Sequence, residues 1–339
     1  MERIQPRTLS TVETMTAIVH DDYSTVPEDV LRLEQVPKPT IAGDRALVRV
    51  HAASVDRGTW HIMAGLPYPI RVAGFGLRNP KYLNPGRSLA GTVEAVGNNA
   101  TGFEPGDEVY GICAGSFAEW VAVKTDKLAP KPSNLSFEEA AAVPISGLAA
   151  LQAVRDHGAV EAGQTVLIVG ASGGVGSFAV QVAKAFGADV TGVCSTAKVD
   201  LLRALGADHV IDYSREDFAD GQHRYDVILD IGGNRRLSHL RRALTPKGRL
   251  VIVGGETEGR WLGGTDRQLR AQLLSLFVSQ KLGTFVASEN AADLVALGEL
   301  IEADKIKPAI DRTYPLSEVA TAIRDLIDGR VRGKIVITV

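Results

Sequence analysis

A glycine-rich turn within residues 164–176 is the feature of this chain whose spacing most clearly indicates chemistry. The apolar run Val166–Val169 before it is typical of a strand buried on both faces of a parallel sheet, and a helical segment, Ser177–Phe186, follows it. Glycines let the backbone approach a pyrophosphate, and the amides at a helix N-terminus attract phosphates. A purely structural turn is the alternative. We expect a dinucleotide site formed by Ser172, Gly173, Gly174 and Val175.

The end of the next predicted strand, Asp189–Cys194, indicates which dinucleotide binds. An NAD site needs a carboxylate there to hold the ribose 2′-hydroxyl, but no acid follows the first residue of this strand before Asp200. The chain instead has Ser195, Thr196 and Lys198, which suit a 2′-phosphate. We therefore expect NADPH rather than NADH, although the two hydroxyls could merely cap the next helix.

The composition is that of an ordinary globular protein with room for two domains. Of 339 residues, 45% are hydrophobic and 23% charged, and 37 Lys and Arg against 40 Asp and Glu give a net charge of −3. This balance argues against a nucleic-acid or membrane partner, and no stretch has the length of a membrane span or the apolar core of a secretory leader. The two cysteines, Cys113 and Cys194, are too few for a disulfide framework or a four-cysteine zinc lobe. We expect a cytoplasmic protein.

The spacing of apolar runs divides the chain into four parts. Residues 1–14 are polar and aperiodic, which predicts a flexible tail, with Met15 as an alternative start. Short β-type runs from Ala46 to Lys124 indicate a small irregular antiparallel barrel, which we place in residues 15–134. Strands alternate with helices over residues 135–285, as in a doubly wound parallel sheet. Residues 286–339 end in a β-branched run that we expect to return to the first domain, because a six-stranded nucleotide fold is already complete.

The expected elements follow from these patterns. In the barrel we expect strands at Ala46–Val55, Gly91–Gly97, Asp107–Ile112 and Ser116–Val123. In the parallel sheet we expect strands at Val166–Val169, Val190–Val193, His209–Ile211, Val227–Asp230, Leu250–Val253 and Thr284–Val286. Amphipathic helices at Ala291–Glu302 and Ser317–Ile327, and a last strand at Lys334–Val339, complete the prediction.

Four further motifs, together with the glycine-rich turn, carry a family resemblance. They are Ala90–Gly97, Phe103–Gly111, Gly115–Glu119 and Ala140–Pro144. From about Met15 to Val339 the chain resembles the medium-chain dehydrogenase/reductase superfamily, and within it the zinc-free quinone oxidoreductase branch. The resemblance implies an α/β protein, in which a Rossmann doubly wound sheet accompanies a GroES-like irregular β-barrel domain. It also implies a homodimer in which two nucleotide domains pair edge to edge.

The positions that hold zinc in related dehydrogenases carry other residues here. Asp56 stands where those relatives have their first cysteine, and residues 85–91 (Pro-Gly-Arg-Ser-Leu-Ala-Gly) lack their His and Glu. Asp56 and His61 alone would make a poor metal site, because a tetrahedral zinc needs His or thiolate ligands. We expect no metal.

The resemblance adds residues to the cofactor site. Lys198 and Tyr213 match the lysine and tyrosine that NADPH-dependent relatives place around the 2′-phosphate, although Tyr213 could also be a packed aromatic at a strand end. The carboxyl ends of the fourth and fifth strands, where a doubly wound sheet binds ligands, carry Asp230, Gly232, Val253 and Gly254. Phe285 and Val286 lie where the family's backbone meets the nicotinamide amide.

The segment expected to contact substrate departs from the family pattern. Asp56 and Thr59 replace an asparagine and an aspartate, and Ala149 replaces a threonine. His61 replaces an aromatic residue, and Trp60 precedes it. The candidate catalytic residues are Asp56, Trp60, His61 and Tyr68.

Two of these candidates could deliver a proton. His61 has an unperturbed pKa of about 6.5, close to working pH, and Tyr68 is a neutral hydrogen-bond donor or a pocket wall. A packed or solvated loop histidine is the alternative for His61.

These observations favour an NADPH-dependent, zinc-independent reductase of quinones or α,β-unsaturated carbonyl compounds. Hydrogen bonds can stabilise the delocalised anion formed from such a small molecule without a Lewis acid. A zinc-free NAD(P)-dependent alcohol dehydrogenase is one alternative. An NADPH-binding sensor with little catalysis is the other, because the departures at Asp56, Thr59 and Ala149 leave room for it.

Overall fold

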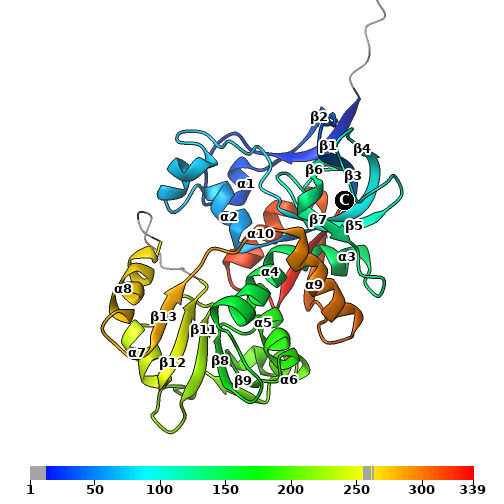
Figure 1. The fold of residues 1–339 in the computed structure, drawn as a ribbon. Coiled ribbons are helices and arrows are strands. Elements are labelled where there is room, and N and C mark those ends of the chain that lie inside the picture. The colour runs from blue at the N-terminus through cyan, green and yellow to red at the C-terminus, as the bar shows by residue number, and fades with distance from the viewer. Residues whose placement is uncertain (1–12, 255–260, 262) are drawn as a thin grey trace, which may run out of the picture.

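The computed structural model of the chain describes residues 13–254, 261 and 263–339. Two lobes lie one above the other in Figure 1, and the chain passes from the upper lobe to the lower one and back. The two lobes confirm the predicted fold class, a nucleotide-type sheet beside a separate β domain. In the described part of the chain, no helix combines the length and apolar character needed to cross a membrane.

The lower lobe contains a six-stranded parallel sheet in the order β10-β9-β8-β11-β12-β13. Its strands are β8 (Thr165–Val169), β9 (Asp189–Cys194), β10 (His209–Asp212), β11 (Tyr225–Asp230), β12 (Leu244–Ile252) and β13 (Lys281–Thr284). Its helices are α4 (Pro144–Gln152), α5 (Gly174–Ala185), α6 (Val199–Ala204), α7 (Leu237–Ala243) and α8 (Thr265–Ser275). Val166, Leu167 and Ile168 of β8 are fully buried, as their unbroken apolar run predicted.

The upper lobe contains a seven-stranded sheet in the order β14-β15-β3-β4-β5-β7, with β6 paired to β3. Its strands are β3 (Arg45–Val55), β4 (Ser88–Val96), β5 (Glu108–Ile112), β6 (Trp120–Lys124), β7 (Leu128–Pro130), β14 (Ile310–Pro315) and β15 (Lys334–Thr338). A separate antiparallel pair joins β1 (Thr14–Val19) to β2 (Arg32–Pro37). The helices are α1 (Pro27–Val30), α2 (Arg57–Ala64), α3 (Phe137–Ala141), α9 (Ala291–Glu302) and α10 (Val319–Ile327).

The C-terminal segment returns to the first domain, as predicted. β15 pairs antiparallel with β3, so that Ile335 lies opposite Val55, and β14 extends the same sheet. Helix α9 has the predicted bounds. The other predicted helix begins later, at Val319, because residues Leu316–Glu318 form a 3-10 turn.

Three predicted boundaries were wrong. The chain at Ser116 does not yet belong to β6, because it turns to meet β1, where Ile18 N–H donates to Phe117 O at 2.9 Å. Strand β13 covers residues 281–284 rather than 284–286, so Val286 lies beyond the sheet. The predicted tail includes residues 1–12, which lie outside the described residues, but Thr14 already pairs with Pro37 in β1.

Candidate active site

The glycine-rich turn lies between β8 and α5, at the carboxyl edge of the parallel sheet. Helix α5 begins at Gly174, and its N-cap residue, Gly173, has no side chain to cap it. A Cβ on Gly176 would lie 2.2 Å from the carbonyl oxygen of Gly170, so only glycine lets the helix pack this close to the strand. The first-turn amides of α5 are therefore held at the edge where the strands end, as a pyrophosphate requires.

The loops after β11 and β12 close around this turn. Gly170 has a φ of +82°, and a Cβ there would lie 2.8 Å from the amide nitrogen of Gly232. Val253 N–H donates to Asp230 O at 3.0 Å, which holds the β12 loop against the β11 loop. The structure thus brings Gly232, Val253 and Gly254 beside the turn, where a dinucleotide backbone could pass.

Asp230 was predicted to contact the cofactor, and the structure corrects this. Its carboxylate is fully buried, forms an ion pair with Arg267 Nη1 at 2.5 Å and accepts a hydrogen bond from Gly233 N–H at 3.2 Å. Burial raises its pKa, which the Arg267 guanidinium opposes. Arg267 also donates to the carbonyl oxygens of Gly254 and Arg235. Asp230 therefore shapes the loops instead of touching a ligand.

The predicted 2′-phosphate residues gather at the ends of β9 and β10. Thr196 Oγ1 donates to Asp212 at 2.5 Å, and this hydrogen bond lowers the pKa of Asp212. Lys198 Nζ donates to Val331 O at 2.6 Å, and burial lowers its pKa. The side chain of Tyr213 is half-exposed, with the guanidinium of Arg235 5.5 Å from its ring.

Two residues near the predicted phosphate site were missed. Asp212 has no signal in the residues that follow β9, because it ends the neighbouring strand, β10, and only the pairing of the two strands places it beside Cys194. Arg235 follows the Gly232-Gly233 pair, and only the fold brings it to Tyr213. Ser195 lies at the same end of β9, before the Thr196–Lys198 turn.

Phe285 and Val286 follow β13 in the segment that leads to the upper lobe. The Phe285 ring stacks on His157, with centroids 4.1 Å apart and planes at 17°. The Val286 side chain is 95% exposed. Val286 and Ala287 make no backbone hydrogen bond to any other residue in the described part of the chain, so their peptide groups are available to a ligand.

Asp56 was predicted to be catalytic, and the structure gives it a different role. It precedes α2, where its N–H bonds Thr59 Oγ1 at 3.3 Å. Its buried carboxylate forms an ion pair with Lys334, and it accepts hydrogen bonds from Ser146 Oγ at 2.8 Å and Ser88 Oγ at 3.2 Å. With these partners the buried carboxylate joins three other segments of the chain, at Ser88, Ser146 and Lys334, rather than facing a substrate.

The other candidate catalytic residues, Trp60, His61 and Tyr68, lie in and just after α2 of the upper lobe, where they take part in two separate aromatic contacts. Trp60 and His61 in α2 meet edge to face, with centroids 5.0 Å apart. Tyr68 instead contacts Trp261, with centroids 5.3 Å apart, and lies 5.0 Å from the guanidinium of Arg71. The contact with Trp261 joins the upper lobe to the chain beyond β12, so Tyr68 borders the space between the lobes, whereas Trp60 packs against the core of the upper lobe.

Burial decides the protonation state of His61. It lowers the pKa of the imidazole, which is therefore neutral at pH 7. Nδ1 lies 2.7 Å from Leu66 O, and because a carbonyl can only accept, Nδ1 carries the hydrogen. Nε2 is then an acceptor, so His61 does not deliver a proton from its charged form at neutral pH.

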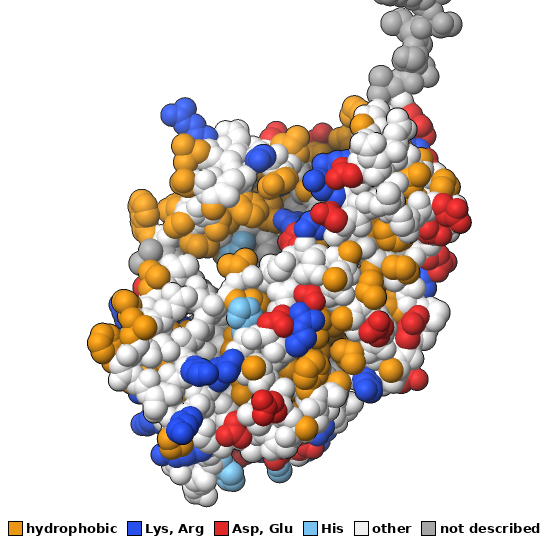
Figure 2. Space-filling view, in the orientation of Figure 1, with side chains coloured by type: hydrophobic (Ala, Val, Ile, Leu, Met, Phe, Trp, Pro, Cys, Tyr) orange, Lys and Arg blue, Asp and Glu red, His pale blue; other side chains and the backbone are white. Residues whose placement is uncertain are grey.

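Figure 2 shows a hollow between the two lobes, with hydrophobic side chains gathered on the upper side. No group of three or more His, Cys, Asp or Glu side chains able to hold a metal ion occurs among residues 13–254, 261 and 263–339. The expectation that the protein needs no zinc stays a prediction.

Comparison with known proteins places the chain in a family. Residues 42–133 match the alcohol dehydrogenase GroES-like domain, and residues 205–337 match a domain described as zinc-binding dehydrogenase. The 2-methylene-furan-3-one reductase of Solanum lycopersicum is 34% identical, over 95% of this chain and 79% of its own. The chain belongs to the medium-chain dehydrogenase/reductase superfamily. Within it, the chain falls in the quinone oxidoreductase-like branch, and it is an oxidoreductase.

Other members of this superfamily agree in sequence and fold. The NADPH-dependent alkenal/one oxidoreductase of Arabidopsis thaliana, described as chloroplastic, is 32% identical over 95% of this chain and 79% of its own. The solved structure of the quinone oxidoreductase from Coxiella burnetii has a TM-score of 0.80 and 30% identity, and covers 96% of this chain and 100% of its own. The superfamily assignment supports a nicotinamide cofactor for this chain.

Proposed function

We propose that this protein is an NADPH-dependent, zinc-independent reductase of quinones or α,β-unsaturated carbonyl compounds. The observation that carries the proposal is the uncapped, glycine-built N-terminus of α5, which lies at the carboxyl edge of the parallel sheet. The contact of Tyr68 with Trp261 brings an aromatic side chain of the upper lobe to the chain beyond β12. The names of the tomato, Arabidopsis and Coxiella relatives, which refer to a methylene-furanone, alkenals and enones, and quinones, support the same chemistry.

The cofactor would be held mainly by backbone. The amides of Ser172, Gly173, Gly174 and Val175 suit the pyrophosphate, and the free peptide groups of Val286 and Ala287 suit the carboxamide. When bound, a reduced nicotinamide supplies hydride to an electron-poor carbon.

The preference for NADPH rests on the cations around Tyr213. Lys198 and Arg235 both lie near the ends of β9 and β10, where they can attract a 2′-phosphate. The buried Asp212 carboxylate is engaged by Thr196 and Ser214, so it is not directed at a ribose hydroxyl.

On the substrate side, the aromatic residues favour a flat conjugated molecule. Tyr68 can donate a hydrogen bond to the developing oxyanion, and neutral His61 can accept one or form a wall. The proton that completes the reaction then comes from Tyr68 or from water, because His61 is uncharged at neutral pH.

We also propose a homodimer, through the β13 edge of the sheet. The backbone of an edge strand pairs readily with another strand, and exposed Leu269, Leu273 and Phe277 lie on or just after α8, which packs beside β13. A cytoplasmic location is a further proposal. Light scattering at micromolar concentration should give the mass of two chains, and the mass of one chain would contradict the dimer.

The activity is tested with a panel of substrates. The purified protein should oxidise NADPH with a quinone and with an enone, and it should not reduce NADP⁺ with a saturated alcohol. Efficient oxidation of the alcohol alone would favour an alcohol dehydrogenase. Tight NADPH binding without turnover of any substrate would favour a sensor. In Tyr68→Phe, loss of a donor should lower kcat, whereas loss of a wall should mainly raise KM.

A further inference from the structure

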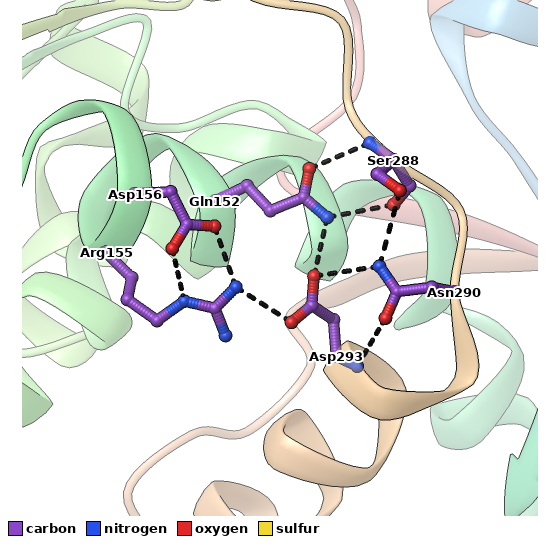
Figure 3. Close-up of polar contacts among 6 residues, drawn as sticks. All are labelled: Gln152, Arg155, Asp156, Ser288, Asn290 and Asp293. Atoms are coloured by element: carbon purple, nitrogen blue, oxygen red, sulfur yellow. Dashed lines mark hydrogen bonds and ion pairs between the residues drawn. The ribbon is translucent and has the colours of Figure 1, made fainter.

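A single glutamine holds the segment that leaves the nucleotide sheet. Gln152 is the last residue of α4, and its side-chain amide bonds both backbone groups of Ser288: Nε2 donates to Ser288 O at 2.8 Å, and Oε1 accepts from Ser288 N–H at 2.8 Å (Figure 3). The side chain thereby fixes the peptide groups on both sides of the Ser288 Cα, as a neighbouring strand would. Gln152 is 4% exposed, so water does not compete for these hydrogen bonds.

Gln152 is itself fixed by a charged network (Figure 3). Its Nε2 also donates to Asp293 Oδ2 at 2.7 Å, and the same oxygen accepts from Asn290 Nδ2 at 3.0 Å. Arg155 Nη2 lies 2.8 Å from the other oxygen, Oδ1. Burial alone would raise the pKa of Asp293, but the hydrogen bonds from Asn290, Arg155 and Gln152 bring it below its ordinary value. The carboxylate therefore stays charged at neutral pH and orients the glutamine amide.

The pair of hydrogen bonds by which Gln152 holds Ser288, here called the clamp, lies close to the peptide groups that we assign to the nicotinamide. The segment is fixed on one side by Thr284, whose hydroxyl donates to Ile252 O at 2.9 Å, and on the other by Ser288. Between them, Phe285 is held by its stack on His157, and the backbone groups of Val286 and Ala287 are free of partners in the described part of the chain. A fully extended chain advances at most about 3.6 Å per residue, so Ser288 lies no more than about 7 Å from Val286.

We propose that Gln152 is a positioning residue for the nicotinamide, acting through Ser288 on the backbone of Val286 and Ala287. The inference rests on the proposed function, because it requires the nicotinamide to lie against this segment. Reacting atoms must be placed to within about 1 Å, so a loose segment should cost rate as well as affinity.

The chain offers a matched control in a second glutamine. Gln181 of α5 bonds Lys307 in the same two-sided way: Nε2 donates to Lys307 O at 3.0 Å and Oε1 accepts from Lys307 N–H at 2.8 Å. It is 7% exposed, so it is about as buried as Gln152. Its target, however, precedes β14 and lies outside the segment assigned to the nicotinamide. Gln152→Met and Gln181→Met thus each remove a pair of hydrogen bonds from a buried glutamine to one backbone residue. Only Gln152→Met affects the segment that we assign to the nicotinamide.

The experiment compares two ligands in three proteins. NADPH and 2′-phospho-ADP-ribose, which lacks the nicotinamide, are titrated into wild type, Q152M and Q181M, and melting temperatures are measured alongside. We expect wild type to bind NADPH more tightly than the fragment. Q152M should lose most of this difference and keep its affinity for the fragment, while Q181M keeps both. In turnover with a quinone, Q152M should lower kcat about tenfold or more, and Q181M should stay within about twofold of wild type.

The possible failures can be told apart. If wild type binds both ligands equally, the nicotinamide is not held by the protein and the proposed function fails at that point. If wild type prefers NADPH and Q152M keeps the full preference, the positioning role is wrong. An equal loss in Q152M and Q181M would show a general effect of stability and would also overturn it. Should Q152M not fold, D293N removes the charge that orients Gln152, and a retained preference for NADPH in D293N would refute the inference.

Discussion

The two sides of the cleft differ in the groups that form their surface, which are backbone groups on one side and side chains on the other. On the side that we assign to the nucleotide, the surface consists mainly of backbone: an uncapped helix N-terminus, glycine turns and the peptide groups after β13 that are free of partners in the described part of the chain. On the side that we propose for the substrate it consists of side chains, with Trp60 and His61 in α2, and Tyr68 against Trp261. A backbone surface tolerates few substitutions, because glycine has no substitute where chains meet at van der Waals distance. A side-chain surface can change with the substrate while the fold persists.

Asp56 and Lys334 stabilise the junction between the two sides. In Lys334→Met, the buried Asp56 carboxylate would lose its cation, which should lower the free energy of unfolding by about 3–5 kcal/mol. The double variant Lys334→Met with Asp56→Leu should recover much of this loss, because an apolar pair leaves no buried charge. Urea denaturation measures both. If Asp56→Asn instead left stability unchanged and abolished turnover, Asp56 would be catalytic after all.

The backbone side should be the more sensitive to a small added group. In Gly176→Ala, the added Cβ would lie 2.2 Å from the carbonyl oxygen of Gly170, so α5 must move away from β8. We expect the Kd for NADPH to rise about hundredfold, equivalent to about 2.7 kcal/mol. The matched change on the substrate side is Gly58→Ala in α2, where an added Cβ meets nothing within 4 Å. Isothermal titration should show normal NADPH affinity for Gly58→Ala, and equal losses in the two variants would undo the contrast.

Lys198 tests one of the two cations that we assign to the 2′-phosphate on the nucleotide side; the other is Arg235. Lys198→Ala should weaken NADPH by about one to two decades and leave NADH nearly unchanged, because only NADPH carries the 2′-phosphate. Burial lowers the pKa of Lys198, so the preference for NADPH should begin to fall at a pH below the ordinary range for lysine. If the ratio of the NADPH and NADH affinities is unchanged in Lys198→Ala, Lys198 only bonds Val331 O and does not contact the 2′-phosphate. Arg235 would then be the better candidate for that contact.

His61 gives the smallest expected effect, on stability. Its folded-state pKa lies below the unfolded value, so the unfolded chain takes up a proton first as the pH falls. The contribution of neutral His61 is therefore complete above the unfolded pKa and declines as the pH drops through about 6.5. Denaturation at pH 7.5 and 5.5 should show a smaller pH dependence in His61→Gln than in wild type. An identical dependence in both would show that the folded protein accepts the proton freely.

The same contrast explains what could be predicted from the sequence. Most strands of the parallel sheet and the glycine turn follow from local patterns, since each buried strand is an apolar run and each close approach needs glycine. Long-range partners have no such signal. Lys334 lies 278 residues from Asp56, and Arg267 lies 37 residues from Asp230, so both carboxylates were taken for site residues. The role of an ionised side chain depends on what folds against it.

The surroundings of the His61 and Tyr68 side chains could not be predicted from the sequence either. The pKa of His61 depends on burial under its neighbours, and the partner of Tyr68, Trp261, lies in another lobe. The two-sided clamp of Gln152 on Ser288 joins residues 136 positions apart, and no local motif marks either of them. Such contacts become visible only with the fold.

The central claim is that this cleft transfers hydride from NADPH to a conjugated carbon without a metal. The most direct measurement treats the protein with a chelator, removes the chelator, and supplies an enone with NADPH deuterated in turn on each face of nicotinamide C4. The account predicts that one of the two cofactors gives a product with one deuterium at the β-carbon. With each cofactor, the chelator-treated protein should react at the same rate as the untreated protein does with that cofactor. A product without deuterium from either cofactor, or turnover that returns only when zinc is added, would contradict it.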